Sequence, residues 1–353
     1  MKTLKLTCIP FLICFIIMLC LNQALLKAQE AGTCAEKLKS AETFFTKGQV
    51  DSIPDLLSEC LKSGFNREEA LSAYKLMIQT LLLNDKLREA DSSMLSFLKS
   101  NPEYKLSPTD HSSFVYLYNS FVVRPVLMIS IRAGVNVPFL TFVQEHPTSG
   151  MPGKSVYKTD AGNIFISLEA KFKISPKLEV GVGAGYSQVK FTNLVNYYDF
   201  ATIQYIETQQ RIEVPVSISY DLVSLGRFTP YIRGGAGVAL NLSTSADASL
   251  NMTDKNNPYS RPGQTLNVKD SRIPVDIFGL AGAGVKFKIP RGFLFLEAKG
   301  SFGFLEQFKP GGKNTSLLQN YYFWSDPDFR LNTFNLSLGY TYIFYKPSKK
   351  MAH

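Results

Sequence analysis

Alternating glycines are the first feature of this sequence that could do chemistry. Gly181, Gly183 and Gly185 lie in the stretch LEVGVGAGYSQV (178–189). Glycine-rich loops bring the backbone close to the phosphates of a nucleotide, but the dinucleotide fingerprint spaces its glycines G-x-G-x-x-G between a strand and a helix. Here the alternation continues past the third glycine into more strand-like residues. We therefore interpret these glycines as making room on one face of a strand, and we expect no cofactor.

A histidine, a serine and an aspartate in one segment are the next candidates. His146, Ser149 and Asp160 are residue types that together activate a nucleophile when they lie within hydrogen-bond reach. All three fall in one turn-rich stretch, where no predicted strand orients them. We therefore expect a non-enzymatic protein with no catalytic residues, and an enzyme at the rim of these loops is the alternative. Neither the histidines nor the cysteines have metal-ligand spacing, so we expect no metal site.

Charged residues recur at alternate positions of strand-like stretches, where they share one face. Eight are bases and five are acids: Arg132, Glu169, Lys171, Lys173, Glu179, Arg211, Glu213, Arg233, Asp276, Lys286, Lys288, Glu297 and Lys299. Charges inside a barrel need partners, and an eight-stranded barrel is just wide enough to be filled by side chains. We therefore expect an ion-paired plug in the lumen. A conducting pore is the alternative, and the excess of bases leaves open an anion site.

The N-terminal residues 1–28 resemble a secretory signal peptide. Lys2 and Lys5 precede an apolar run at 6–21, shorter than the ~20 residues of a membrane-spanning helix, and Ala28 suits cleavage. We predict an exported chain, with an uncleaved anchor as the alternative. Three lysines leave with the signal, so the formal charge falls from +9 to 9 − 3 = +6. No basic cluster remains that would predict nucleic-acid binding.

Two cysteines remain after the signal, Cys34 and Cys60, on either side of Gly48. Helical periodicity flanks this glycine, which is typical of a helix C-terminus, so the two thiols would lie level at the open end of a helical hairpin. Because exported proteins fold in oxidising compartments, we predict a Cys34–Cys60 disulfide. Two buried, unpaired thiols are the alternative.

Helical periodicity continues beyond this hairpin, so residues 29–125 are expected to form an all-α domain. Residues 71–102, with Ala90 in the stretch READ and Pro102 at the end, resemble part of a tetratricopeptide repeat. The resemblance implies a protein or peptide partner. A plain helical bundle is the alternative.

From residue 126 the apolar period becomes that of a strand. Eight alternating segments follow, at about 126–139, 163–174, 178–191, 203–220, 228–242, 274–289, 293–304 and 329–345. Three short connections (SPK, DLVSLGR and PRG) alternate with four long polar ones, as in transmembrane barrels with periplasmic turns. We therefore predict an N-terminal all-α module followed by an all-β, eight-stranded antiparallel transmembrane β-barrel. A soluble β-sandwich is the alternative.

Four barrel segments carry a family resemblance: RIEVPVSISY (211–220), FTPYIRGGAGVAL (228–240), FLFLEAKGSFGF (293–304) and FNLSLGYTYIF (334–344). Residues 126–345 resemble the PorT-like family of small outer-membrane barrels of Bacteroidetes. The resemblance implies location and architecture rather than activity, and the helical domain departs from the plain barrel of that family.

An even strand number places both barrel ends on one side of the outer membrane. Because the second strand leads into a short turn, that side is expected to be the periplasm. We expect the helices to dock a protein partner there, in an envelope assembly, secretion or motility complex. The predicted domains are a signal peptide (1–28), a periplasmic helical domain (29–125), an outer-membrane barrel (126–345) and a periplasmic tail (346–353).

Aromatic residues gather at two predicted outer loops: Tyr197, Tyr198, Tyr321, Tyr322 and Trp324. Aromatics at this level are typical of the girdle at a membrane interface. Binding of a ligand or partner at the cell surface is the alternative.

Overall fold

The structure is a computed structural model that describes residues 34–144, 154–160, 162–197, 200–254, 259–309 and 316–350. The predicted signal peptide, together with His146, Ser149 and Tyr198, lies outside the described residues. The chain divides into two compact units, Met1–Arg124 with Tyr345–His353, and Pro125–Phe344.

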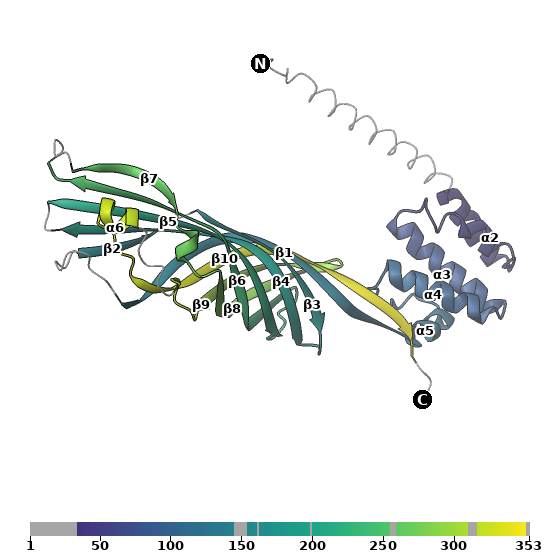
Figure 1. Cartoon of the computed structure of the whole chain (residues 1–353). Helices are drawn as coiled ribbons and strands as arrows, with labels where there is room; N and C mark the ends of the chain where they lie inside the picture. Colours follow the sequence, from purple (N-terminus) through teal and green to yellow (C-terminus); the bar gives the residue numbers. More distant parts are fainter. Residues whose placement is uncertain are drawn as a thin grey trace, which may run out of the picture. The chain divides into compact units, whose positions relative to one another are not determined.

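Helices make up most of the first unit. Residues 34–46 are helical, and four helices follow: α2 (Ile53–Ser58), α3 (Arg67–Leu83), α4 (Leu87–Ser100) and α5 (Ser112–Asn119) (Figure 1). Across the described residues, no helix has the length and apolar character needed to cross a membrane.

Local signals set the helix boundaries. Asn66 and Glu69 form a capping box at the start of α3, in which each side chain accepts a hydrogen bond from the other residue's backbone. Gly48 follows the first helix with a φ of +76°, the left-handed conformation that favours glycine at a helix end. The helix α5 begins only at Ser112, because the Asp110 carboxylate accepts from Ser107 N at 2.7 Å and holds a turn before it.

The apolar faces of these helices form one core. Ile78, Met94, Phe97 and Phe114 have no exposed surface. At one end of this core the predicted Cys34–Cys60 disulfide is confirmed, with a Cα–Cα distance of 5.7 Å. A disulfide that closes a loop of this length stabilises a fold by roughly 3 kcal/mol.

The C-terminal end of the last strand belongs to the first unit. Tyr345 donates to Glu103 Oε1 at 3.1 Å, and Lys349 Nζ lies 2.5 Å from Asp91 Oδ2. The predicted tail, 346–353, therefore begins as strand, which continues to Lys349.

The second unit is built on an antiparallel sheet closed into a ring of eight strands. In ring order these are β1 (Phe121–Gln144), β3 (Asn163–Lys173), β4 (Leu178–Tyr197), β5 (Ala201–Asp221), β6 (Phe228–Met252), β8 (Val275–Ile289), β9 (Gly292–Gly303) and β10 (Asp328–Lys349), which returns to β1. The predicted ring of eight antiparallel strands is confirmed.

Side chains alternate between the two faces of this wall. Large aliphatic side chains are exposed on the outside of the ring, among them Ile131, Leu168, Val216, Leu296 and Leu338. Charged side chains at the intervening positions are buried inside. A strand places successive side chains on opposite faces, so the sequence alternation alone produces an apolar outside and a polar inside.

Two neighbours of β5 run well past their predicted ends, β4 to Tyr197 rather than 191 and β6 to Met252 rather than 242. The β4–β5 pairing continues to Tyr197↔Ala201, and the β5–β6 pairing continues to Ala201↔Met252. Two further strands, β2 (Lys154–Thr159) and β7 (Arg261–Asn267), pair with β4 and β6, and the short helix α6 (Ser316–Tyr322) contacts β6. Segments that we predicted as loops thus form a sheet that extends from one end of the barrel (Figure 1).

Candidate functional site

The candidate site is a cluster of ion pairs in the middle of the lumen. Arg132, on β1, lies between two carboxylates from opposite parts of the wall. It contacts Glu169 Oε2 through Nη2 and donates from Nη1 to Glu297 Oε1 at 2.6 Å. Arg233, on β6, contacts the same two carboxylates, with Nη2 2.5 Å from Glu169 Oε1 and Nη1 3.4 Å from Glu297 Oε2. Two arginines and two glutamates therefore connect β1, β3, β6 and β9 across the lumen.

Other polar groups complete the cluster. Lys171 Nζ lies 3.6 Å from Glu169 Oε2, and Ser217 donates to Glu169 Oε1 at 3.1 Å. Tyr231 donates to Glu297 Oε2 at 2.7 Å. Buried charges are tolerated when they are paired and hydrogen-bonded, and each of these two carboxylates has at least three partners. Tyr231 did not figure in our sequence analysis, although its position on the inward-facing side of its strand could have indicated it.

Eleven of the thirteen predicted lumen charges are buried: Arg132, Glu169, Lys171, Glu179, Arg211, Glu213, Arg233, Asp276, Lys286, Glu297 and Lys299. The prediction is wrong for Lys173 and Lys288, which are exposed. Both lie at strand ends, one at the last residue of β3 and the other next to the last of β8, where the wall no longer encloses the side chain.

A second group of ion pairs closes the end of the lumen near the short turns. Lys286 Nζ lies 2.8 Å from Glu179 Oε1 and 2.6 Å from Asp221 Oδ1. The same ammonium group lies over the ring of Phe293, 4.9 Å from its centroid. An aromatic ring therefore shares the pairing of Lys286 with the carboxylates. Lys299, nearer the other end of β9, lies 4.6 Å from the centroid of Phe165.

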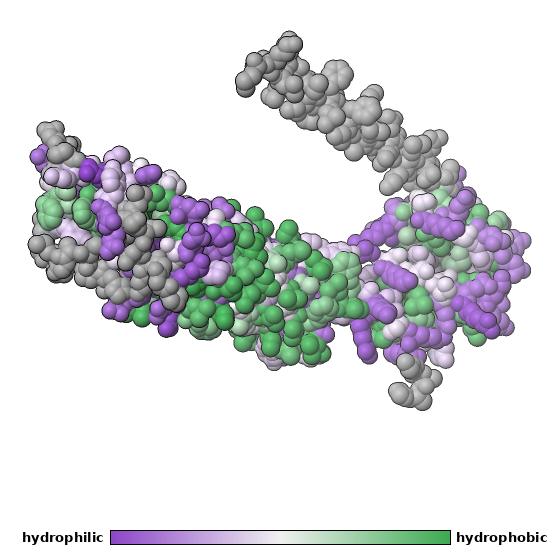
Figure 2. All heavy atoms as spheres, in the orientation of Figure 1, coloured by the Kyte–Doolittle hydropathy of each residue, from purple (hydrophilic) through white to green (hydrophobic). Residues whose placement is uncertain are grey.

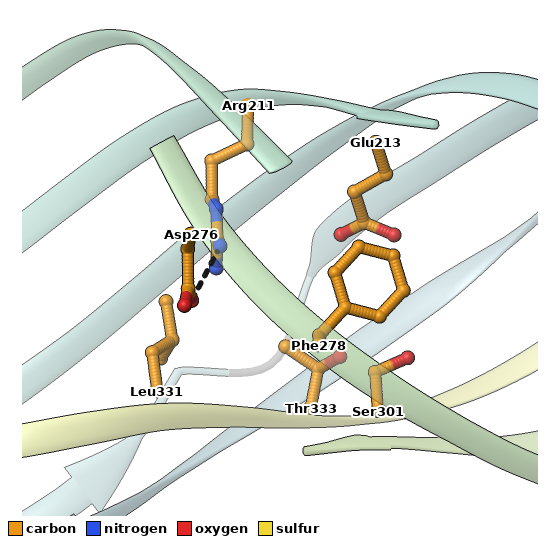
Figure 3. A pocket seen from close by; sticks show the side chains of 7 residues that line it. All are labelled: Arg211, Glu213, Asp276, Phe278, Ser301, Leu331 and Thr333. Atoms are coloured by element: carbon orange, nitrogen blue, oxygen red, sulfur yellow. Dashed lines mark hydrogen bonds and ion pairs between the residues drawn. The ribbon is translucent and has the colours of Figure 1, made fainter. Parts of the chain in front are cut away.

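A small cavity lies beside the ion pair between Arg211 and Asp276 (Figure 3). Arg211 Nη2 donates to Asp276 Oδ2 at 3.0 Å, and the cavity measures about 10 Å³, room for one water molecule. Asp276 Oδ1 and Ser301 Oγ, which belong to residues lining it, have no hydrogen-bond partner among the described residues. Glu213 lies on the opposite side of the cavity (Figure 3). The polar lining and the size suit a single bound water.

The alternating glycines of β4 lie against this network. A Cβ added at Gly181 would lie 2.6 Å from Glu169 Oε1, and one at Gly185 would lie 2.5 Å from Ser167 Cβ. Neither distance is compatible with an ordinary contact. The prediction that these glycines make room inside the barrel is confirmed, and they stand in a continuous strand rather than in a loop before a helix.

A third cluster lies in the sheet extension, and our sequence analysis missed it. The guanidinium of Arg272 is fully buried, with Nη2 2.5 Å from Glu207 Oε2 and Nη1 3.2 Å from Asp326 Oδ2. Burial raises the pKa of the Asp326 carboxyl above its ordinary value, although Arg272 opposes the shift. Glu207 has the same strand parity as the lumen residues of β5, which is a signal that could have found it.

The predicted aromatic residues belong to this extension. Trp324 stacks on Tyr205 with a centroid distance of 4.4 Å, and both are buried, as is Tyr322. Trp324 and Tyr322 therefore belong neither to an exposed interfacial girdle, as we predicted, nor to an exposed binding surface, the alternative. Tyr321 remains exposed, and Tyr197 packs against the edge of the same core.

Of the three loop residues considered for catalysis, only Asp160 lies among the described residues. Asp160 Oδ2 lies 3.4 Å from Lys190 Nζ and accepts from Thr192 at 3.3 Å, so this carboxylate is already engaged. In the part of the chain that the structure describes, no group of three or more histidine, cysteine, aspartate or glutamate residues is arranged to hold a metal ion.

No protein-family model matches this chain, and no curated protein matches it either. Among solved structures, matches include neisserial surface protein A, at 12% identity and a TM-score of 0.32, covering 62% of this chain and 97% of that one. Another is the outer membrane protease OmpT from Escherichia coli, at 9% identity and a TM-score of 0.38, covering 62% and 96%. A third is Ail, the attachment invasion locus protein of Yersinia pestis, at 13% identity and a TM-score of 0.28, covering 62% and 99%. These similarities are too low to transfer an activity, so the function must be argued from the chain's own geometry.

Proposed function

We propose that this protein is a non-enzymatic outer-membrane β-barrel with a closed lumen, and that it anchors a periplasmic helical module that binds a protein partner. The observation that carries the proposal is the ion-paired cluster around Glu169 and Glu297, which fills the middle of a ring whose outside is apolar.

The apolar outside of the ring supports a place in the membrane. Figure 2 shows the apolar residues gathered over the wall of the barrel. Exposed aliphatic residues line every strand of the ring, far more than the scattered apolar residues of a water-soluble surface. A closed antiparallel ring satisfies its own backbone hydrogen bonds, which is what a strand-built membrane protein requires.

The connections between strands support the orientation. Residues 174–177, 222–227 and 290–291 make short turns at one end, and the sheet extension stands at the other. In barrels of this kind the short turns lie in the periplasm. The first and last strands of an even-numbered ring end on that same side, so the helical unit is proposed to be periplasmic.

The ion pairs support a closed lumen rather than a channel. Arg132 and Arg233 bridge carboxylates from different strands, so an open path would require several buried pairs to separate at once. The test is single-channel recording of the purified protein in planar bilayers. We expect no conductance steps, and stable, reproducible openings would contradict the closed lumen.

The interaction module is tested by crosslinking in intact cells. Tyr116 on α5 is 82% exposed, and Tyr259 in the sheet extension is 63% exposed, so the two tyrosines form a matched pair on different units. A photoreactive amino acid replaces each in turn. We expect a discrete crosslinked protein from position 116 and none of the same mass from position 259. No adduct at 116, or the same adduct at both, would remove the anchor proposal.

The finer assignments are part of the same proposal. The helical pair α3–α4 is joined by only residues 84–86, a connection short enough for a repeat-type pair, and we propose a peptide-binding role for that pair. Membership of the PorT-like family and a role in an assembly, secretion or motility complex stay predictions that a captured partner would decide.

A further inference from the structure

An apolar pocket lies at the far end of the sheet extension. It measures about 190 Å³ and is lined by Tyr197, Phe200, Ala201, Ile203, Leu250, Met252 and Phe323. We propose that this pocket binds one small, neutral, apolar molecule. Its position outside the cell rests on the proposed function, whereas binding itself does not.

The floor of the pocket is built on paired strands. Ile203 on β5 stands opposite Leu250 on β6, and Ala201 stands opposite Met252. Ala201, Ile203 and Leu250 are buried in the core that also contains Trp324. Because the floor belongs to a regular sheet with a packed core, the pocket is present before any ligand arrives, which lowers the entropic cost of binding.

Two phenylalanine rings form the rim. Phe200 and Phe323 are 53% and 54% exposed, although both are large apolar residues. The backbone of Phe323 is left-handed, with a φ of +53°. This conformation is unfavourable for a residue other than glycine. Strained residues of this kind cluster at binding sites, and here the strain holds an aromatic ring at the mouth of an apolar cavity.

The lining decides the class of ligand. It contains no charged side chain, and Tyr197 carries its one hydroxyl group. A charged ligand would lose its hydration without gaining a partner. The volume is similar to that of an engineered cavity of roughly 150 Å³ that binds benzene. The pocket therefore fits a neutral ring or branched hydrocarbon group of about six to ten heavy atoms.

The position excludes lipid chains as the occupant. Leu242, an outward aliphatic residue of the apolar wall, precedes Leu250 by eight residues on β6. At about 3.3 Å per residue, that is roughly 26 Å along the strand. The pocket lies well beyond the apolar wall, so its ligand must come from the aqueous phase.

The chain contains a built-in reporter for the test. Trp324 is its single tryptophan, follows Phe323 directly and is buried in the core beneath the pocket. The full-length protein in lipid nanodiscs is titrated with toluene while Trp324 fluorescence is recorded. We expect a saturable change. Benzoate, which has a ring of the same size and a charge, is expected to bind at least tenfold more weakly.

Three variants locate the binding. Ala201→Phe fills the pocket and is expected to weaken toluene binding at least tenfold. Thr202→Phe places the same ring on the opposite face of the same strand and should bind toluene as the wild type does. Phe323→Gly removes the rim ring and relieves the left-handed strain, so we expect binding to weaken about threefold or more while resistance to unfolding is kept.

Three results would overturn the proposal. One is a fluorescence response that rises linearly with toluene, as partitioning into the nanodisc would produce. Another is equal toluene affinity in Ala201→Phe and Thr202→Phe. The third is unchanged affinity in Phe323→Gly, which decides the matter even if Ala201→Phe fails to fold. None of these results affects the conductance or crosslinking experiments, so failure of the pocket and failure of the anchor are distinguishable.

Discussion

Replacing Glu169 by glutamine tests whether the lumen cluster holds the barrel together. Glutamine keeps the size of the side chain and removes its charge. The cluster of Arg132, Lys171, Arg233, Glu169 and Glu297 carries 3 − 2 = +1 in the wild type and 3 − 1 = +2 in the variant. Removing one partner of a buried ion pair costs about 3–5 kcal/mol, because the other charge is left buried without compensation.

The geometry places the expected loss near the lower end of that range. Both arginines keep a carboxylate, since each also contacts Glu297, whereas no second carboxylate among the described residues lies within ion-pair distance of Lys171. We therefore expect the free energy of unfolding to fall by about 3 kcal/mol. The double variant Glu169→Gln with Lys171→Met returns the cluster to 2 − 1 = +1. It should be at least about 1 kcal/mol more stable than the single variant.

Guanidinium unfolding of the barrel in lipid vesicles measures both effects, with Trp324 fluorescence and gel mobility as independent signals. Glu306→Gln is the matched control, because this glutamate is exposed, and it should change stability by less than about 0.5 kcal/mol. If Glu169→Gln is as stable as this control, the cluster does not hold the wall together. If the double variant is less stable than the single one, the cost of an uncompensated charge is not the reason for the loss.

Three further predictions follow from other contacts. Gly181→Ala places a Cβ against the central glutamate and should lower barrel stability by about 1–3 kcal/mol in the same assay, whereas Gly234→Ala, with its nearest contact at 3.9 Å, should cost less than about 1 kcal/mol. Reduction of the Cys34–Cys60 disulfide should lower the melting temperature of the helical unit seen by circular dichroism, and a double serine variant should no longer respond to the reductant. Burial by itself would raise the pKa of the Asp110 carboxyl. Hydrogen bonds from neighbouring groups outweigh this effect, so the pKa of Asp110 lies below its ordinary value. Its stabilising effect is therefore complete above pH ~4 and is lost as the pH falls below that value, so acid should destabilise the helical unit less in Asp110→Asn than in the wild type; equal acid profiles would contradict this.

The parts of the fold that followed from the sequence are those in which burial repeats with the strand or helix period. The wall alternates aliphatic and charged residues, as at Leu168, Glu169 and Lys171. The position of a charged residue in this alternation was therefore enough to predict that it faces the lumen. The disulfide could also be predicted from the sequence. Gly48 marks the turn between two short helices, and Cys34 and Cys60 lie at similar distances on either side of it.

The sheet extension escaped prediction because turn-forming residues occupy one face of its strands and resemble a polar loop. In the stretch STSADASLNM of β6, the buried Ala246, Ala248 and Leu250 alternate with Asp247, Ser249 and Asn251, but serine, aspartate and asparagine are also the typical residues of turns. Trp324 looked like an interfacial aromatic because its burial depends on Tyr205, which is distant in sequence. The Arg272 cluster joins residues from three separate segments, and no local pattern indicates such a contact.

The helical unit includes the last strand residues of the chain as well as the first helices. Tyr345 and Lys349 bond to Glu103 and Asp91, and the whole barrel is encoded between these partners. During synthesis the helices therefore cannot make these bonds until the final strand has been translated. The helical unit is thus completed only after β10 has been made.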